Sequence, residues 1–312
     1  MMKLYSAADV HSALEWTTLT SALAAAFAAG AVVPLRHVHA LNADDLMLLM
    51  PAWNADVIGL KLVTVLPGAH ALGAPTVGAT YVLLDRASGV PRAVLDGDAL
   101  TVRRTAAVSA LAARYGARAD ASTLLMVGTG HLAPWMVRAH CATRPGITRV
   151  LLWGRDAERT DALALALSDE GLPVDAVRDL PSAVPQAHIV CCATTASEPV
   201  VRGEWLAPGT HLDLVGGFTR GMREVDDAAV ARSRISVDTY DGVLAEAGDI
   251  VVPMERGVIT REQVVADLAQ LVRGERHGRT RDDEITLFKS VGTALSDLAG
   301  AQAVVAQPRT AE

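Results

Sequence analysis

The segment that is most informative about the fold of this chain is Leu124-Leu125-Met126-Val127-Gly128-Thr129-Gly130-His131-Leu132-Ala133. Four apolar residues predict a buried strand, and the glycines after them predict a tight turn into a helix. In such a turn Gly128 permits the sharp bend, Gly130 lets a pyrophosphate approach the backbone, and Ala133 lets helix and strand pack closely. The helix N-terminus supplies N–H donors for the anion. We therefore expect a dinucleotide-binding loop made of Gly128, Thr129, Gly130, His131, Leu132 and Ala133, with an ordinary strand-to-helix turn as the alternative.

Helices and short apolar strands alternate on both sides of this loop. Helices are expected over residues 101–115 and 156–168, and strands over 124–127, 149–153, 189–192, 211–215 and 234–237. Short apolar strands separated by helices are typical of a doubly wound parallel sheet. The fold class is therefore α/β.

The first hundred residues follow a different pattern. Ser6 and Asp9 form a capping box, helix-forming sequence runs to Ala29, and Gly30 is placed to end that helix. Strands are expected over residues 57–65, 80–85 and 93–95, the last two flanking a turn at 86–89. This part is predicted to be a small antiparallel sheet with helices beside it. A last helix, from Ser290 to about Val305, could pack back on it.

Composition excludes several classes of function. Among 312 residues there are 28 basic and 35 acidic side chains, a net charge of −7 and no basic block, which argues against a nucleic-acid partner. The uncharged stretch between Glu15 and Arg36 is mostly Ala and Thr, interrupted by Gly30 and Pro34, so we expect no membrane span. Three cysteines suit a reducing compartment. We expect a soluble, cytoplasmic protein.

The end of the second strand of the parallel sheet indicates the cofactor. An NAD site usually places an acidic side chain there, on the ribose 2′-hydroxyl. This chain has Trp153-Gly154-Arg155-Asp156, with Gly154 near the acidic position and Arg155 beside it. A guanidinium could bind a 2′-phosphate in a bidentate manner, which favours NADPH over NADH. The alternative is that Arg155 is a solvated surface charge and that Asp156 only caps the next helix.

Three cations lie in or beside apolar segments of the first part: Arg36, Lys61 and Arg104. Lys61 interrupts a run that otherwise predicts a buried strand, where an unpaired ammonium would be costly. It therefore either extends outward to solvent or faces a polar site. No serine or cysteine resembles a catalytic nucleophile, Cys191 and Cys192 are expected to be small core residues, and the histidines show no spacing typical of metal ligands. We expect no metal.

Seven short motifs together resemble the ornithine cyclodeaminase/mu-crystallin family over nearly the whole chain. They are Pro34-Leu35-Arg36, Gly59-Leu60-Lys61, Leu95-Asp96-Gly97, Arg104-Thr105-Ala106-Ala107, the Gly128 loop, Trp153-Gly154-Arg155 and Phe288-Lys289-Ser290-Val291-Gly292. The resemblance implies a homodimer whose substrate-binding and dimerisation domain has a Rossmann domain inserted into it. We expect residues 1–115 and 290–312 to form the former domain, and residues 116–289 the latter.

The same resemblance implies roles for the cations. Arg36 and Arg104 would bind a substrate carboxylate, while Lys61 would lie over the reacting carbon, bind substrate and act as the catalytic residue. A lysine beside two arginines should have a depressed pKa, so it could transfer a proton near neutral pH. Ala193, Thr194 and Val291 are also assigned to the cofactor site on this basis.

Within the family, the segment 211–226 is most similar to the reductases of cyclic ketimines. It departs from them at Arg220, where the family usually has proline, and it has Phe218 where cyclodeaminases have an aspartate. The resemblance implies NAD(P)H-dependent reduction of Δ1-pyrroline-2-carboxylate or Δ1-piperideine-2-carboxylate to L-proline or L-pipecolate. Ornithine cyclodeaminase activity, alanine dehydrogenase activity, and non-catalytic NADPH-dependent binding of a small ligand remain alternatives.

Overall fold

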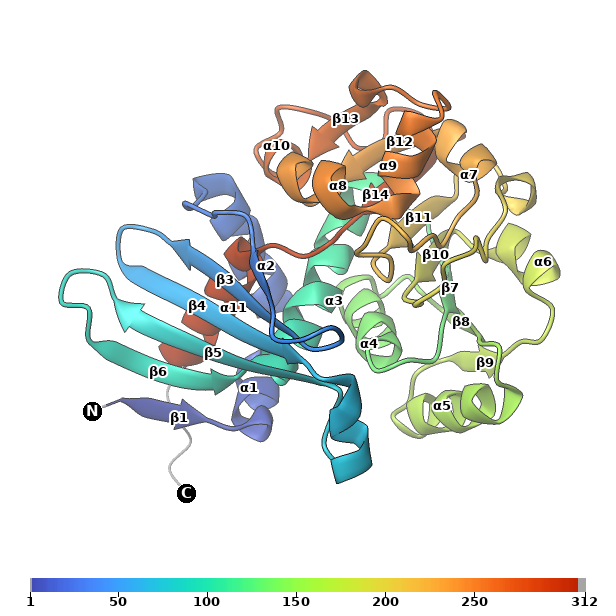
Figure 1. Cartoon of the computed structure of the whole chain (residues 1–312). Coiled ribbons are helices and arrows are strands. Elements are labelled where there is room, and N and C mark those ends of the chain that lie inside the picture. Colours follow the sequence, from blue (N-terminus) through green and yellow to red (C-terminus); the bar gives the residue numbers. More distant parts are fainter. Residues whose placement is uncertain (1, 308–312) are drawn as a thin grey trace. The chain divides into compact units, whose positions relative to one another are not determined.

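The computed structural model describes residues 2–307 and divides into two compact units (Figure 1). Unit 1 comprises residues 1–104 and 293–312, and unit 2 comprises residues 105–292. The helix α3 (Gly97–Gly116) contributes residues to both. Within residues 2–307, no helix combines the length and the apolar character that crossing a membrane requires.

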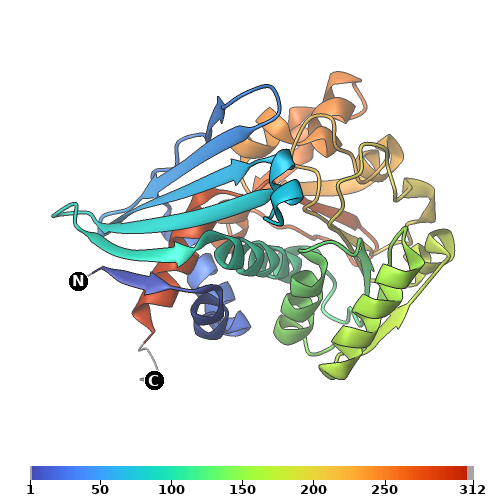
Figure 2. The ribbon, with the colours of Figure 1, turned by 60° about the horizontal axis from the view of Figure 1, so that its bottom comes forward.

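Unit 1 is a six-stranded sheet with helices on one face. Its strands are β1 (Lys3–Tyr5), β2 (His37–Ala40), β3 (Leu46–Trp53), β4 (Val57–Val65), β5 (Val77–Asp85) and β6 (Pro91–Asp96), in the order β1-β6-β5-β4-β3-β2. Its helices are α1 (Ala7–Ala13), α2 (Trp16–Ala29), the 3-10 helix η1 (Pro67–Leu72) and α11 (Ala294–Ala306). Helix α11 packs against β3, β4 and β5 and against α2 (Figure 2).

The strand pattern of β4 explains what faces α11. A Cβ added to Gly59 would lie 2.8 Å from the Cδ1 atom of Leu298 in α11, so Gly59 permits close approach of the helix. Side chains alternate across a strand, so Lys61 shares this helix-facing side, whereas Leu60 and Leu62 point to the other face. That second face is apolar and half-exposed.

Two details of the first part differ from the expected pattern. The helix from Ser6 to Ala29 is two helices, because the chain leaves helical geometry at Leu14 and Glu15 caps α2 by accepting hydrogen bonds from the N–H groups of Thr17 and Thr18. The capping box of Ser6 and Asp9 is confirmed. The sheet is also not wholly antiparallel, since β1 pairs with β6 in parallel.

Unit 2 is a doubly wound parallel sheet, which confirms the expected fold class. Its strands are β7 (Thr123–Val127), β8 (Arg149–Trp153), β9 (Val174–Ala176), β10 (Ile189–Cys192), β11 (His211–Leu214), β12 (Ser233–Val237), β13 (Val264–Asp267) and β14 (Ile285–Lys289). All pairs are parallel, in the order β13-β12-β14-β11-β10-β7-β8-β9. The strand order reverses between β7 and β10, and ligands of such sheets bind at the carboxyl ends of the strands beside this reversal.

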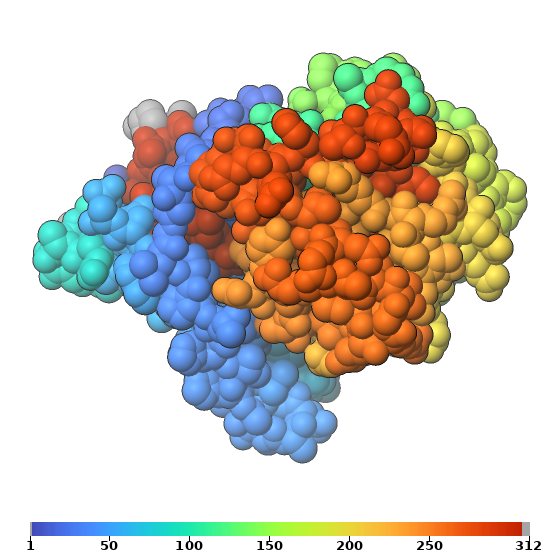
Figure 3. All heavy atoms as spheres, turned by 90° about the horizontal axis from the view of Figure 1, so that it is seen from above, coloured from blue at the N-terminus to red at the C-terminus, as the bar shows by residue number. Residues whose placement is uncertain are grey.

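Helices and short turns connect these strands. They are α4 (Ala133–Thr143), α5 (Ala157–Asp169), α6 (Leu180–Ala183), α7 (Asp227–Ala231), α8 (Tyr240–Glu246), α9 (Gly248–Glu255) and α10 (Leu268–Val272), with 3-10 turns at η2 (Val184–Gln186), η3 (Gly203–Trp205) and η4 (Arg261–Gln263). Figure 3 shows the orange face of unit 2 that α8, α9 and α10 help to form.

The final helix begins later than expected. Ser290 does not open it, because Ile285–Lys289 is the strand β14 and Thr293 caps α11 instead. Residues 290–292 are held by the Asp238 carboxylate, which accepts hydrogen bonds from the Ser290 hydroxyl and from the Val291 and Gly292 N–H groups at 2.8, 3.1 and 2.8 Å. The non-helical backbone before α11, in which Gly292 has a φ of +81°, therefore has a hydrogen-bond partner of its own.

Candidate active site

Lys61 is buried in unit 1 and paired. Its side chain, from the middle of β4, is 3% exposed, and its Nζ lies 2.8 Å from Oδ2 of Asp297 in α11. It also lies 3.5 Å from the hydroxyl of Thr101. Of the two possibilities that the sequence leaves open, the structure places Lys61 in a polar site rather than in solvent.

Arg104 binds the same carboxylate. Its Nε donates to Oδ1 of Asp297 at 2.8 Å, and the side chains are 6% and 0% exposed. The neighbouring Arg103 takes a different role, because its guanidinium stacks 3.7 Å from the ring centroid of Trp16. The motif match at Arg104 rather than Arg103 therefore agrees with the geometry: Arg104 and Lys61 share Asp297.

Charge and burial set the protonation of this cluster. Burial lowers the pKa of Lys61 to about 8, against the opposing effect of Asp297 and with a contribution from Arg104 and Arg36. Burial by itself would raise the pKa of Asp297, but Arg104 and Lys61 hold it below its usual value. The expected depression of the lysine pKa is therefore present, and its largest cause is desolvation rather than the arginines.

Arg36 completes the set of cations. It is half-buried and lies just before β2, and its charge acts on Lys61. Two cations therefore pair with the Asp297 carboxylate and the charge of a third acts on Lys61, which leaves an excess of positive charge for an anionic ligand. A guanidinium binds a planar carboxylate well, and a lysine of pKa about 8 can give up a proton near neutral pH.

Two residues of this cluster were not found from the sequence. Asp297 is a single acid in an otherwise small and apolar helix, and that isolation is the signal that could have revealed it. Tyr81 lies opposite Lys61 on β5, is fully buried, and its hydroxyl finds no hydrogen-bond partner within the described residues. Burial and the charge of Asp297 raise its pKa well above the usual value, so it stays a phenol.

The glycine loop of unit 2 has the geometry that the sequence predicts. Gly128 follows β7 with a φ of +117°, a value that favours glycine, and its added Cβ would lie 2.6 Å from the carbonyl oxygen of Ala193. Gly130 is exposed, and a Cβ there would meet nothing within 4 Å. Ala133 is fully buried where α4 begins.

The loops beside the glycine loop complete one edge of the sheet. Ala193 and Thr194 follow β10, so they stand at the reversal of strand order next to Gly128. Gly154 follows β8, and a Cβ there would lie 2.7 Å from Cγ2 of Thr129, so only glycine lets the two loops pack this closely. Val291 is nearly buried in the turn after β14.

Arg155 is exposed at this edge, and Asp156 caps α5 by accepting the N–H of Arg159 at 3.1 Å. Arg159 is a second cation here that the sequence analysis did not single out, and its Nη2 lies 3.4 Å from the carbonyl oxygen of Thr129. The edge therefore offers two guanidinium groups beside the glycine loop. The Asp156 cap is compatible with either interpretation of Arg155.

A dinucleotide fits these residues. No side chain caps the N-terminus of α4. The N–H groups of Ala133 and Trp135 bond to the carbonyl oxygens of Gly130 and Leu132, and Pro134 has no N–H, so the donors for a phosphate would come from the loop before Ala133, which is open at Gly130. His131 and Leu132 lie in the same turn. The loop residues Gly128–Ala133, with Gly154 and Arg155, would hold the phosphates and ribose of the cofactor.

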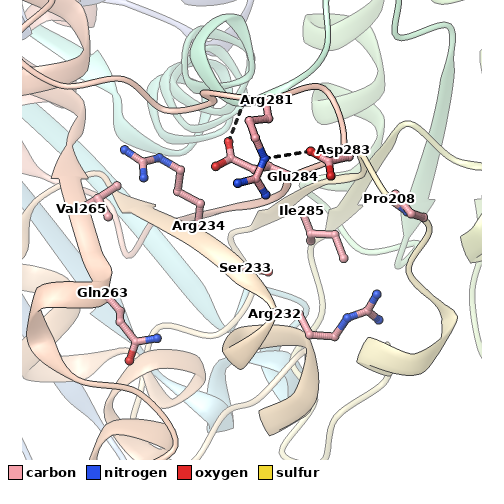
Figure 4. A pocket seen from close by; sticks show the side chains of 10 residues that line it. All are labelled: Pro208, Arg232, Ser233, Arg234, Gln263, Val265, Arg281, Asp283, Glu284 and Ile285. Atoms are coloured by element: carbon pink, nitrogen blue, oxygen red, sulfur yellow. Dashed lines mark hydrogen bonds and ion pairs between the residues drawn. The ribbon is translucent and has the colours of Figure 1, made fainter.

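A hollow of about 510 Å³ lies elsewhere on unit 2 (Figure 4). Its walls include Ser233 and Ile285, the first residues of β12 and β14, so it opens at the amino ends of the strands, opposite the glycine loop. Its arginines have protein partners: Arg281 pairs with Asp283 at 3.0 Å, and Arg234 donates to the carbonyl oxygen of His277. None of the glycine-loop residues lines it.

One buried group, His140, Cys191 and Asp213, brings possible metal-ligand atoms within 4.8 Å of one another. The Asp213 oxygens already accept hydrogen bonds from Ser109 at 2.9 Å and His140 at 3.0 Å. Burial raises the pKa of Cys191 well above its usual value, so it stays a thiol rather than a thiolate ligand. We interpret the group as a polar cluster of the core.

Comparison with known proteins places the chain in a family. The family model described as ornithine cyclodeaminase/mu-crystallin family matches residues 1–311. The chain belongs to this family.

Three similar proteins give further detail. This chain is 36% identical to Delta(1)-pyrroline-2-carboxylate reductase of Colwellia psychrerythraea over an alignment of 315 positions, which covers 97% of this chain and 98% of the other. The structure of Thermococcus litoralis Delta(1)-pyrroline-2-carboxylate reductase in complex with NADH and L-proline is 34% identical, with a TM-score of 0.92 over 97% of this chain and 96% of that one. An archaeal alanine dehydrogenase dimer with bound NAD is 28% identical, with a TM-score of 0.91 over 97% and 95% of the two chains.

Proposed function

We propose that this family member reduces cyclic ketimines that carry a carboxylate, with Δ1-pyrroline-2-carboxylate and Δ1-piperideine-2-carboxylate as substrates and L-proline and L-pipecolate as products. The observation that carries the proposal is the buried cluster of Lys61 and Arg104 on Asp297, with Arg36 nearby. The relatives named as pyrroline-2-carboxylate reductases support it. The chain is therefore an oxidoreductase acting on the C=N bond.

Each cation has a separate task in this proposal. Arg104 and Arg36 bind the substrate carboxylate, and Asp297 holds the guanidinium of Arg104 in place. Lys61 lies over the reacting carbon and holds or donates a proton at its Nζ, since its pKa of about 8 leaves it mainly protonated at neutral pH. Bound NADH or NADPH supplies the hydride.

We propose a preference for NADPH. Arg155 and Arg159 lie beside the glycine loop where an NAD site usually has an acid, and a 2′-phosphate would find two guanidinium groups there. NADH remains a cofactor, as in the Thermococcus relative.

We also propose a homodimer that forms through the outer face of the sheet of unit 1. On that face the register sets Leu60 between Pro51 and Val82, and Leu62, two residues further along β4, is 37% exposed. An apolar sheet face of this kind is typical of a surface that a partner covers. The alanine dehydrogenase relative is a dimer. In light scattering, the protein should have the mass of a dimer and Leu60→Asp that of a monomer, whereas the control Leu165→Asp, at an exposed leucine of α5, should remain dimeric. A monomeric wild type would contradict the proposal.

We also propose that the protein is located in the cytoplasm. All three cysteines are free thiols, and free thiols are compatible with a reducing compartment.

The experiment that tests the function is an absorbance assay at 340 nm, about the wavelength at which NADPH absorbs and its oxidised form does not. Pyrroline-2-carboxylate and piperideine-2-carboxylate should each cause loss of absorbance that depends on the protein. A small-ligand binder would instead quench the fluorescence of NADPH without consuming it. Binding without turnover by either substrate would favour that alternative.

A further inference from the structure

Three charged side chains of unit 2 are completely buried and have no part in the proposed chemistry. They are Glu224, Asp249 and Lys289, each 0% exposed. The Nζ atom of Lys289 lies 2.9 Å from Oδ2 of Asp249 and 3.8 Å from Oε2 of Glu224. Burying charged groups costs free energy, and apolar residues could fill the same volume. The hydrogen bonds of the two carboxylates show what this buried cluster holds together.

The Glu224 carboxylate joins two loops. One oxygen accepts the N–H of Thr194 at 2.8 Å and its hydroxyl at 3.0 Å. The other accepts the N–H of Gly216 at 2.8 Å and that of Gly217 at 3.4 Å. Thr194 follows β10 and Gly216 follows β11, and these strands are neighbours in the sheet. A single side chain therefore links the carboxyl ends of two adjacent strands.

Asp249 and Lys289 fix Glu224 in turn. Oδ1 of Asp249, in α9, accepts the backbone N–H groups of Glu224 at 2.7 Å and Val225 at 3.2 Å. Lys289, the last residue of β14, donates to the other oxygen of Asp249. The glycines allow this close approach, because a Cβ on Gly216 would lie 2.4 Å from Oε1 of Glu224.

The link reaches the dinucleotide loop. A Cβ on Gly128 would lie 2.6 Å from the carbonyl oxygen of Ala193 and 3.3 Å from Cγ2 of Thr194, so these loops are in van der Waals contact. Because Glu224 fixes the position of Thr194, it also helps to fix the position of Gly128. A displacement of Thr194 would therefore also move the glycine loop, which is the turn proposed to bind the pyrophosphate of the cofactor.

We propose that Glu224, held by Asp249 and Lys289, is a positioning residue that fixes the loops after β10 and β11 for cofactor binding. The inference rests on the proposed function for the identity of the cofactor. Glu224 is not a catalytic residue, since its carboxylate is buried behind both loops and bonds to their backbone.

Glu224→Gln is the direct test. The amide keeps the size of the side chain, and its oxygen can accept hydrogen bonds from one loop, but its NH₂ group must then face the N–H donors of the other. One loop loses its acceptor, so the dissociation constant of NADH, from fluorescence titration, should rise about tenfold. The kcat with pyrroline-2-carboxylate should fall as well.

Asp213→Asn is the matched control. Asp213 is also a fully buried carboxylate of the same sheet, on β11, but it bonds to Ser109 and His140 and to neither loop. This variant should lower the melting temperature as Glu224→Gln does, yet keep the NADH dissociation constant within about twofold of the wild type. If both variants weaken NADH binding equally, or if Glu224→Gln binds NADH as tightly as the wild type does, the proposed positioning role of Glu224 is wrong.

Glu224→Asp provides a second test should the glutamine variant not fold. Aspartate keeps the negative charge beside Lys289 but is one methylene shorter, so it can reach only one loop, and NADH binding should weaken by several-fold. Unchanged binding would overturn the proposal. The NADH titration needs no imine, so failure of the proposed function, seen as binding without turnover in the wild type, is distinguishable from failure of this inference.

Discussion

Lys61 is the side chain on which the proposed reaction most depends. It is buried, lies 2.8 Å from Asp297, and has a pKa of about 8. Lys61→Met removes the ammonium but keeps much of the volume, so kcat should fall at least about a hundredfold, as for the loss of a general acid. Steady-state kinetics with pyrroline-2-carboxylate measures this, with Lys3→Met, at an exposed lysine of β1, as the control.

The same lysine should determine the alkaline side of the pH profile. The protonated fraction of Lys61 falls as pH rises through about 8, so kcat/KM should decline above that pH. The residual activity of Lys61→Met should lack this decline. Near-normal turnover by Lys61→Met would rule out its role as proton donor.

Arg104 and Arg103 form a matched pair of neighbours. Arg104→Met removes the guanidinium that bonds to Asp297. It should weaken the binding of carboxylate substrates by about 3 kcal/mol, which lowers kcat/KM roughly a hundredfold. Arg103→Met removes a cation of similar burial that stacks on Trp16, so it should reduce stability but keep KM. Equal effects of the two substitutions on KM would contradict the assignment of Arg104.

Arg155 decides the choice between the two cofactors. Arg155 is exposed beside the glycine loop, where an NAD site usually has an acidic residue. Arg155→Ala should therefore raise KM for NADPH at least about tenfold and leave KM for NADH nearly unchanged. Measuring both constants on one preparation makes the comparison. Equal changes for both cofactors would remove Arg155 from the 2′-phosphate site.

The loop after β11 should exclude ornithine cyclisation. The family resemblance aligns Phe218, 47% exposed, with an aspartate of cyclodeaminases, and a phenyl ring can neither accept a proton nor pair with an ammonium. Nearby carboxylates are engaged: Asp226 caps α7 and accepts the N–H of Gly203, while Asp227 pairs with Arg223. Incubation with L-ornithine and NAD⁺ should release no ammonia. Stoichiometric ammonia with proline would show that another residue supplies the carboxylate.

At the scale of elements, local patterns predicted what local forces determine. The strand 149–153, the strand 189–192 and the capping box at Ser6 depend on apolar runs and nearby hydrogen bonds, and each was predicted with its correct position. The break at Leu14 was missed because the acid Glu15 acts there as a cap inside a continuous helical pattern. The parallel pairing of β1 with β6 joins residues about 90 apart, which no local pattern specifies.

At the scale of the whole molecule, the site could be predicted only in part. Lys61 was indicated because a cation in an apolar run is unusual, whereas the role of Arg104 came from the motif that resembles the family. The sequence did not indicate Asp297, which follows Arg104 by 193 residues and meets it only because α11 packs beside α3, where a Cβ on Gly300 would lie 2.8 Å from Cδ1 of Leu100. The cluster of Glu224, Asp249 and Lys289 was missed for the same reason, although Lys289 lies in one of the seven motifs, since their pairing depends on strands and helices that are distant in sequence.

The most direct test of the central claim uses NADH that carries one deuterium at C4 of the nicotinamide. The two stereoisomers, with deuterium on one face of the ring or on the other, are tested separately, because the hydride leaves from only one face. The wild type, given Δ1-pyrroline-2-carboxylate, should form L-proline with one deuterium at C2 from one labelled form, as seen by mass spectrometry and NMR. The account predicts this product and its strong reduction in Lys61→Met. Proline without deuterium from either form, or no proline at all, would contradict it.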